Sequence, residues 1–323
     1  MVKSYQISKP GDIKTLKLKK NKLADPGPGE VRVKNHFVGV NHMDVHFRNG
    51  TYALGKYPFT PGISGAGEIV KVGDRVKDFK VGEKVAYGTN FLGSYSEEIN
   101  IRANYIVGVD SAVTLEQAAA CIVPGLTSHY LIYNTYQVKK GNYVLVTGAT
   151  GSVGHILCQW LTSLGADVTG VVGNDAKATQ AKNFGCKHVL NYKNKDFLDR
   201  AMEITRKSGY NVSYDAIGNA IFDQHMDVLS ILGLLVNYGD TSGIIDKFDP
   251  MKLMPKGLFY TKPNLTLYKA NRMELVLSAQ VVFDNIKNKV IRPIYETVDF
   301  GKIAEAHAKI ESAKTVGSVV ARL

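Results

Sequence analysis

The spacing of apolar positions changes partway along the chain, and the change predicts two regions of different fold. Up to about residue 115, short alternating or fully apolar runs such as Val31–Lys34 and Gly67–Val72 are separated by turns rich in glycine, proline, asparagine and aspartate. This pattern is typical of a compact, mostly antiparallel β domain. At Thr114 the sequence Thr-Leu-Glu-Gln predicts a capped helix start, and we expect Pro124 to interrupt that helix.

From Gly141 to about Tyr260, apolar strands alternate with amphipathic helices. This order predicts an α/β region with a parallel sheet covered on both faces. The expected strands are Tyr143–Thr147, Val168–Val172, His188–Asn191, Val212–Ile217, Leu234–Tyr238 and Leu258–Thr261. The expected helices between them are Ala176–Phe184, Phe197–Lys207 and Phe222–Leu232. Towards the end of the chain we expect helices over Arg272–Ile286 and Phe300–Glu311 and a strand over Ser318–Ala321.

The most informative segment is a glycine-rich turn between a buried strand and an amphipathic helix. Relative to the pattern G-x-G-x-x-G, Ala149 takes the place of the first glycine, and Gly151 and Gly154 take the other two. A glycine at 151 lets the backbone approach a pyrophosphate, one at 154 lets the helix pack tightly, and the helix N-terminus presents free N–H groups. We therefore expect dinucleotide binding by Ala149, Thr150, Gly151, Ser152, Val153 and Gly154.

The end of the second strand of this region favours NADP over NAD. An acidic residue there would accept hydrogen bonds from the ribose hydroxyls of NAD. The chain instead has Gly173 and Asn174, and Lys177 follows on the next helix. A small residue with a cation nearby suits the 2′-phosphate of NADP. Asp175 lies in the same turn and argues for the opposite choice.

Composition and charge narrow the class of protein. The 323 residues are enough for about two domains, and 45% of them are hydrophobic, as in ordinary globular proteins. Three widely spaced cysteines, Cys121, Cys158 and Cys186, form no CxxC pair, so we expect free, packed thiols in a reducing compartment, the cytoplasm. The first residues show no signal peptide, and no stretch reaches the ~20 apolar residues of a membrane span.

The net charge of +11 comes from 40 basic and 29 acidic residues that are scattered along the chain. We interpret the scattered lysines among them as side chains of a solvated surface. A basic surface also attracts phosphate-bearing partners, but no zinc finger or RNP-type aromatic pattern supports nucleic-acid binding.

Several short motifs together resemble one family. They are Gly39–Asp44, Arg48–Tyr52, Pro61–Gly67, Gly93–Glu97, Gly125–Thr127, the glycine turn, Tyr214–Gly218 and Ala306-His307. With them the whole chain resembles the zinc-independent, ζ-crystallin-like quinone oxidoreductases of the medium-chain dehydrogenase/reductase superfamily. The resemblance implies a Rossmann doubly wound domain over residues 126–262 and a GroES-like, mostly antiparallel β domain over 1–125 and 263–323. It also implies a homodimer, with the sixth-strand edge near Phe259–Thr261 as its interface.

No metal site is expected. Zinc-dependent members of the superfamily carry a cysteine where this chain has Asn41 and a His-Glu pair where it has Ile63-Ser64, and residues 85–115 hold no cysteines for a structural zinc. His36, His42 and His46 share a segment but lack a thiolate or carboxylate at a plausible ligand position.

The resemblance implies hydride transfer from NADPH to a quinone or a related conjugated carbonyl. Asn41 would hydrogen-bond the nicotinamide ribose or the acceptor oxygen, and Tyr52 would donate to a quinone oxygen. Leu126 and Thr127 would open a helix after Pro124 and flank the nicotinamide. The further cofactor contacts that it implies are His42, Asp44, His46, Tyr130, Tyr192, Ile217, Gly218, Tyr238, Gly239, Asp240, Thr241, Ser242 and Lys262, the last reaching a phosphate.

Two alternatives stay open at this point. One is an NADPH-dependent reductase of the double bond in enones or alkenals, which needs the same cofactor and a similar apolar slot. The other is a non-enzymatic role in NADPH or RNA binding, against which the scattered lysines argue mildly.

Overall fold

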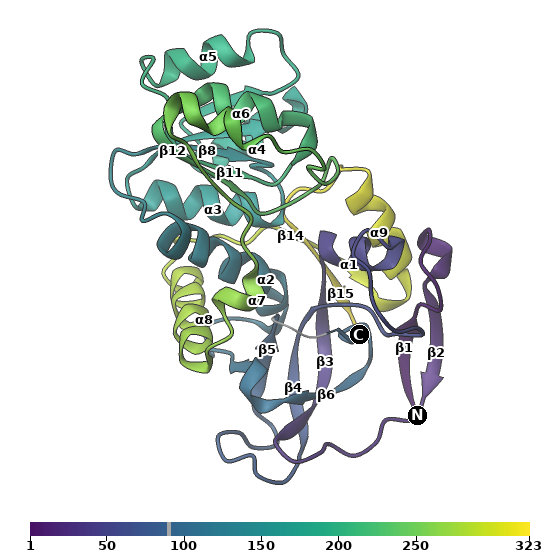
Figure 1. Ribbon diagram of the computed structural model, residues 1–323. Coiled ribbons are helices and arrows are strands. Elements are labelled where there is room, and N and C mark those ends of the chain that lie inside the picture. The colour runs from purple at the N-terminus through teal and green to yellow at the C-terminus, as the bar shows by residue number, and fades with distance from the viewer. Residues whose placement is uncertain (89–91) are drawn as a thin grey trace. The chain divides into compact units, whose positions relative to one another are not determined.

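The computed structural model describes residues 1–88 and 92–323 (Figure 1). These residues pack into two units. The first comprises Met1–Leu126, Lys269–Lys289 and Pro293–Leu323, and the second comprises Thr127–Tyr268 and Val290–Arg292. The chain thus passes between the units at Leu126/Thr127 and Tyr268/Lys269, and again before Val290 and after Arg292. The sequence analysis instead predicts a second domain over residues 126–262.

The second unit is built on a six-stranded parallel sheet with the order β10-β9-β8-β11-β12-β13. Its strands are β8 (Tyr143–Thr147), β9 (Asp167–Val172), β10 (His188–Asn191), β11 (Tyr210–Asp215), β12 (Leu229–Asn237) and β13 (Phe259–Thr261). Its helices are α3 (Ser152–Ser163), α4 (Ala178–Asn183), α5 (Phe197–Ile204), α6 (Phe222–Val228) and α7 (Leu265–Tyr268). The doubly wound parallel sheet predicted from the sequence is confirmed.

The strand order makes β8 and β11 the place where the sheet reverses direction of winding. The chain proceeds from β8 outwards to β10 and then returns to continue from β11 on the other side of β8. Ligands of such sheets bind beyond the carboxyl ends of the strands at this reversal. The strands are rich in apolar residues because helices cover them, and Leu145, Val171 and Leu235 are completely buried in one core cluster.

The first unit contains a seven-stranded, mostly antiparallel sheet with the path β14-β15-β3-β4-β5-β7, in which β6 also pairs with β3. Its strands are β3 (Glu30–Val40), β4 (Ser64–Val72), β5 (Lys84–Tyr87), β6 (Glu98–Arg102), β7 (Ile106–Gly108), β14 (Tyr295–Asp299) and β15 (Ser318–Arg322), and β1 (Val2–Gln6) pairs separately with β2 (Lys17–Asn21). Its helices are α1 (His42–Asn49), α8 (Arg272–Lys287) and α9 (Ile303–Glu311). The mostly antiparallel β domain is also confirmed.

The helix at Thr114 departs from its prediction. The capping box forms, since the Thr114 hydroxyl accepts from the Gln117 N–H at 3.1 Å. However, α2 (Leu115–Tyr130) continues through Pro124, so the predicted interruption is wrong. A proline removes the N–H that would bond the carbonyl four residues earlier. Here the Ser318 hydroxyl donates to that carbonyl, on Ala120, at 2.8 Å and satisfies it.

A second correction concerns the helix predicted over Phe222–Leu232. The helix α6 ends at Val228, and its last predicted turn belongs to β12. The pairing of β11 with β12 shifts register between Tyr210 and Val212, so the extra residues form a bulged start of the strand. Pairing with a neighbouring strand has outweighed the local helical pattern. The helix predicted to reach Lys207 also ends earlier, at Ile204.

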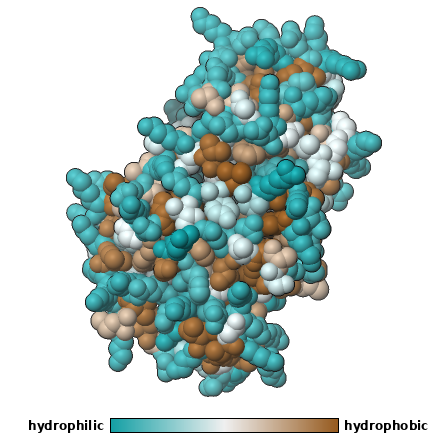
Figure 2. Space-filling view, turned by 180° about the vertical axis from the view of Figure 1, so that it is seen from behind, coloured by the Kyte–Doolittle hydropathy of each residue, from teal (hydrophilic) through white to brown (hydrophobic). Residues whose placement is uncertain are grey.

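Hydrophilic side chains cover most of the face drawn in Figure 2, and apolar patches lie between them. Within residues 1–88 and 92–323, no helix is both long enough and apolar enough to span a membrane.

Candidate functional site

The predicted dinucleotide turn lies between β8 and α3, at the reversal of the sheet. The helix α3 begins at Ser152 with Gly151 as its N-cap. A Cβ atom on Gly154 would lie 2.1 Å from the carbonyl oxygen of Gly148, so only glycine lets α3 pack this closely on the turn. The free N–H groups at the start of this twelve-residue helix form the cradle that a pyrophosphate requires. The geometry therefore fits the proposed cofactor.

The sequence analysis missed one member of this turn. Gly148 has a φ of +61°, a left-handed conformation that favours glycine. The sharp bend is therefore made by Gly148, and Ala149, which was aligned with the first glycine of the pattern, is a buried residue beside it. The signal was present in the sequence, because a glycine directly follows the buried strand.

The ends of β9 and β10 bring the proposed adenosine-side residues together. A Cβ atom on Gly173 would meet the Tyr192 ring at 3.5 Å, an ordinary contact, so there is space beside this glycine. Lys177 ends the short 3-10 turn that starts at Asp175, and partial burial lowers the pKa of its ammonium group. The Asp175 carboxylate accepts a hydrogen bond from the Asn191 amide at 3.1 Å. Asp175, the acidic residue that would favour NAD, thus already accepts one hydrogen bond within the protein.

A buried carboxylate organises the loops beyond β11 and β12. Asp215 accepts hydrogen bonds from the Thr147 hydroxyl at 2.9 Å and the Asn237 amide at 2.8 Å. Burial by itself would raise the pKa of Asp215, but the nearby His225 and hydrogen bonds from Ile217 and Asn237 outweigh it and lower that pKa below its ordinary value. Asp215 thus ties β8, β11 and β12 together at their carboxyl ends. Sequence reasoning had noted it only as part of a motif.

The loops after β11 and β12 are joined by hydrogen bonds. The Ser242 hydroxyl donates to the Ile217 carbonyl at 2.6 Å, and the Thr241 N–H donates to the Ala216 carbonyl at 3.2 Å. The buried hydroxyl of Tyr238 has no hydrogen-bond partner among the described residues. This hydroxyl therefore lies inside the packed protein.

Lys262 lies next to these loops. Its ammonium group donates to both carboxylate oxygens of Asp240, at 2.7 and 2.9 Å, and to the Asn237 amide oxygen at 2.6 Å. The structure thus pairs two predicted cofactor residues, Asp240 and Lys262, with each other.

In the first unit, Asn41 precedes α1 and its side-chain amide is held in place. The Asn41 Nδ2 donates to the Ser64 hydroxyl at 2.9 Å and, more weakly, to the Asp44 carboxylate at 3.4 Å. The Asn41 backbone N–H donates to the same carboxylate at 2.8 Å. Because both amide hydrogens are engaged, Asn41 presents an acceptor oxygen rather than the donor that sequence analysis considered for the substrate oxygen.

Three of the predicted site residues have aromatic rings that lie close together on α1 and the turn after it. The His42 and His46 rings lie 4.8 Å apart, and the His46 and Tyr52 rings are also 4.8 Å apart. The helix spacing of four residues places the two histidines on one face. The structure therefore brings the rings of His42, His46 and Tyr52 together.

Behind Asn41 lies a fully buried chain of polar groups. The Tyr95 hydroxyl donates to the Asp44 carboxylate at 3.0 Å and lies 3.0 Å from Nε2 of His307. Burial raises the pKa of Asp44 to about 7, although the hydrogen bonds from Asn41 and Tyr95 act in the opposite direction. Burial, together with the charges of Arg48 and His42, lowers the pKa of His307 to about 3, so its ring is neutral at ordinary pH. Sequence analysis had not connected these groups.

The predicted residues on α2 lie inside a continuous helix. Leu126 and Thr127 do not open a helix after Pro124, because α2 has already run for eleven residues when it reaches Leu126. Leu126 is completely buried. Tyr130 stacks on Tyr268 with ring centroids 4.6 Å apart and nearly parallel planes.

Among the described residues, no three histidine, cysteine, aspartate or glutamate side chains are grouped so as to hold a metal ion. The three cysteines are buried and free, as expected.

Comparison with known proteins places the chain in a family. Residues 27–141 match the alcohol dehydrogenase GroES-like domain, and residues 152–269 match the family described as zinc-binding dehydrogenase. The chain is 36% identical to quinone oxidoreductase 1 of Escherichia coli over 91% of both chains, and 34% identical to the quinone oxidoreductase of Pseudomonas aeruginosa over 99% of both. The chain belongs to the quinone oxidoreductase family of the medium-chain dehydrogenase/reductase superfamily.

Solved structures of this family agree with the fold. The E. coli quinone oxidoreductase, crystallised in complex with NADPH, superimposes with a TM-score of 0.97 at 34% identity, covering 99% of this chain and all of that one. A 2-haloacrylate reductase from Burkholderia is 35% identical over 99% of this chain and 98% of its own length. The name of this relative indicates reduction of a 2-haloacrylate rather than of a quinone.

Proposed function

We propose that this quinone oxidoreductase family member is an NADPH-dependent reductase that transfers hydride to quinones or related conjugated carbonyls. The observation that carries the proposal is the Gly148–Gly154 turn, whose close packing requires glycine at 154. At the end of the second strand of the same sheet the chain has Gly173 in place of the acid that would accept a ribose hydroxyl. The NADPH bound to the E. coli relative supports the same cofactor. The nicotinamide supplies the hydride when it is bound.

We assign each site residue to a part of the cofactor or the substrate. The turn from Ala149 to Gly154 holds the pyrophosphate, while Gly173 and Lys177 receive the 2′-phosphate. The acceptor oxygen of Asn41 receives a ribose hydroxyl, since its amide hydrogens are already engaged by Ser64 and Asp44. Tyr52 remains the proposed donor to the substrate carbonyl.

The single most informative experiment is a turnover assay of the purified protein with NADPH against a panel of quinones, enones and simple alcohols, with and without a chelator. We expect quinones to be reduced, simple alcohols to be inert and the chelator to have no effect. Oxidation of ethanol with NADP, or loss of turnover when a stoichiometric metal is removed, would contradict the proposal. Tight NADPH binding without turnover would favour a binding role.

Reduction of an activated double bond is the second candidate, and the 2-haloacrylate reductase relative favours it. A quinone and a haloacrylate differ in charge at neutral pH. The ratio of kcat/KM for a neutral quinone to that for an anionic conjugated acid therefore separates the two activities.

Replacement of Tyr52 by phenylalanine should lower kcat/KM for quinones by up to about tenfold, because a neutral hydrogen bond is worth about 0.5–1.5 kcal/mol. The affinity for NADPH should not change. Tyr133→Phe, which removes a half-exposed hydroxyl in the second unit, is the matched control. Equal rates in wild type and Tyr52→Phe would remove Tyr52 from the site.

Lys177→Ala should weaken NADPH binding by about tenfold and leave NADH binding almost unchanged. A charge-assisted hydrogen bond is worth roughly 1.5–3 kcal/mol, and solvent screening places this one at the low end. Gly173→Asp should weaken NADPH binding further through repulsion, since its Cβ fits against Tyr192. Titration of both cofactors measures these affinities.

The control for this series is Lys182→Ala, which removes an exposed lysine from α4. If Lys177→Ala lowered the affinities for NADPH and NADH equally, the lysine would only support the fold. A wild-type preference for NADH would show that Asp175 binds the ribose.

We also propose a homodimer through the β13 edge. β13 ends the six-stranded sheet, and exposed apolar side chains lie along it and β12, namely Phe259, Ile231 and Leu232, at 58, 77 and 65% exposure. Such an unpaired, apolar edge favours pairing with a second copy. Light scattering should give twice the chain mass for wild type and the single mass for Phe259→Lys. A wild-type monomer would reject this interface.

The three buried, free cysteines support a reducing location, and we propose the cytoplasm. Fractionation of the native cell, with the protein recovered in the membrane or an extracellular fraction, would overturn this.

A further inference from the structure

A cavity in the first unit is lined by basic side chains, none of which belongs to the proposed cofactor or substrate site. Its volume is about 480 Å³. It is lined by the turns at residues 28–29, 75–78 and 102–104 and by the first residue of α8. The charged residues of the lining are Arg75, Lys77, Asp78, Arg102 and Arg272. Four cations and one carboxylate thus line one cavity.

Backbone hydrogen bonds tie the turns of this cavity to one another. The Gly29 N–H donates to the Asp74 carbonyl at 2.6 Å, and the Ala103 N–H donates to the Gly29 carbonyl at 3.0 Å. A Cβ atom on Gly73 would lie 2.2 Å from the carbonyl oxygen of Gly27, so these turns are in close contact. The basic side chains therefore start from a fixed backbone, which reduces the entropy lost when a ligand orders them.

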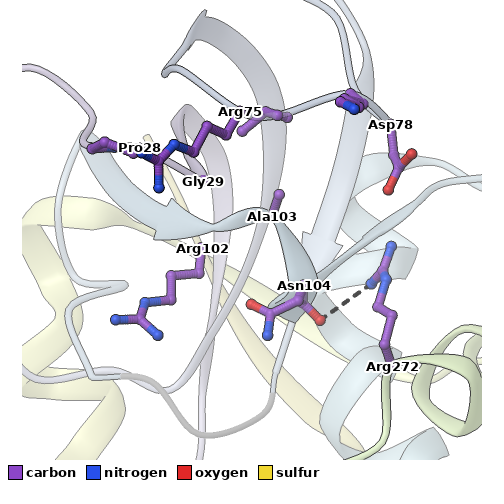
Figure 3. A pocket seen from close by; sticks show the side chains of 10 residues that line it. Pro28, Gly29, Arg75, Asp78, Arg102, Ala103, Asn104 and Arg272 are labelled. Atoms are coloured by element: carbon purple, nitrogen blue, oxygen red, sulfur yellow. Dashed lines mark hydrogen bonds between the residues drawn. The ribbon is translucent and has the colours of Figure 1, made fainter.

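Arg272 forms a rigid wall of the cavity. Its guanidinium group donates to the carbonyls of Asn104, at 3.3 Å, and Ile106, and it lies 5.7 Å from the centre of the Phe79 ring. Figure 3 shows Asp78 on the same side of the cavity as Arg272, and the charge of Asp78 acts on that guanidinium. The single carboxylate of the lining, Asp78, therefore acts on Arg272, whose guanidinium group already donates to two backbone carbonyls.

The other three cations of the lining are Arg75, Lys77 and Arg102. In the part of the chain that the structure describes, Arg75, Lys77 and Arg102 form no ion pair. The nearby carboxylate of Asp25 is engaged by Lys71 at 2.7 Å. Like charges that line one cavity repel one another, so a bound anion would relieve this repulsion.

We propose that this cavity binds a small, soluble anion that carries two or more phosphate groups. Arginine side chains match phosphate oxygens with paired hydrogen bonds, and a lysine adds a compact charge. A single phosphate would leave much of the 480 Å³ empty and would reach fewer of the cations on the three turns. The proposal goes beyond the reductase reaction and does not depend on it.

Calorimetric titration of tripolyphosphate at constant ionic strength tests the proposal. It is done with and without saturating NADPH, because the proposed dinucleotide turn also binds phosphates. We expect one site per chain that persists in the presence of NADPH. The double variant Lys77→Gln/Arg102→Gln should weaken this binding at least tenfold.

The control is Lys19→Gln/Lys20→Gln, which removes the same charge from exposed positions on β2 and should leave the affinity within twofold. Melting temperatures show that each variant folds. Absence of binding in the presence of NADPH, or equal weakening in both double variants, would overturn the proposal. Much tighter binding of single-stranded RNA, with the same dependence on Lys77 and Arg102, would assign the cavity to a nucleic acid and equally overturn it.

Discussion

Gly154→Ala should destabilise the protein by about 3 kcal/mol or more and reduce NADPH binding at least tenfold. The added methyl group would lie 2.1 Å from the Gly148 carbonyl oxygen, which is backbone and cannot rotate away. The helix α3 must therefore move off the turn, and overpacking of this kind typically costs about 1–3 kcal/mol and occasionally more. Denaturant unfolding gives the stability, and fluorescence titration gives the affinity for NADPH.

The control is Gly301→Ala, because a Cβ atom there would meet no atom within 4 Å. It should leave both quantities unchanged. The result would contradict our account of the turn if Gly154→Ala bound NADPH as tightly as wild type. A loss of stability alone, with unchanged affinity, would separate the packing role of Gly154 from cofactor binding.

The second large effect concerns pH. Between pH 4 and pH 7 the free energy of unfolding of wild type should fall by about 3 kcal/mol more than that of Asp44→Asn. Burial raises the pKa of Asp44 from 3.8 to about 7. Well below pH 3.8 the carboxyl is protonated in both states, and its full contribution to stability is present. Between these values the unfolded state loses the proton first, so stability decreases by about 1.4 kcal/mol for each pH unit.

Asparagine is a suitable replacement because its oxygen can accept the hydrogen bonds from Asn41 and Tyr95 while carrying no charge. Denaturant unfolding of both proteins at several pH values gives the difference, in which the titration of all other groups cancels. Asp246→Asn, at an exposed loop position, is the control and should follow wild type. If wild type and Asp44→Asn showed the same pH dependence, the Asp44 carboxyl would be ionised in the folded protein throughout this range.

Local patterns in the sequence determined the order of elements and the dinucleotide turn. Six parallel strands and the helices between them follow from apolar runs separated by amphipathic segments, because each element needs only its own residues to show its period. The Gly151-x-x-Gly154 spacing predicts close packing of backbone, and the 2.1 Å approach to Gly148 is its physical counterpart. Sequence also placed His42, His46 and Tyr52 on one short segment, where they meet.

Only the tertiary structure decided the features that depend on residues far apart in the chain. The helix α2 passes through Pro124 because the Ser318 hydroxyl, 198 residues from Ala120, satisfies the carbonyl that proline leaves unbonded. The segment after Val228 becomes strand because β11 pairs with it. A local pattern contains neither partner, so it could not predict either outcome.

The same reason separates the site residues that were expected from those that were not. The ionisation of Asp44 depends on burial and on Tyr95, which comes from a distant turn, and the donor capacity of Asn41 depends on Ser64. The basic cavity likewise forms from three turns and the start of α8. Residue types and spacing determined which groups this protein has for binding and catalysis, whereas folding determined their partners, and the partners set protonation and the direction of each hydrogen bond.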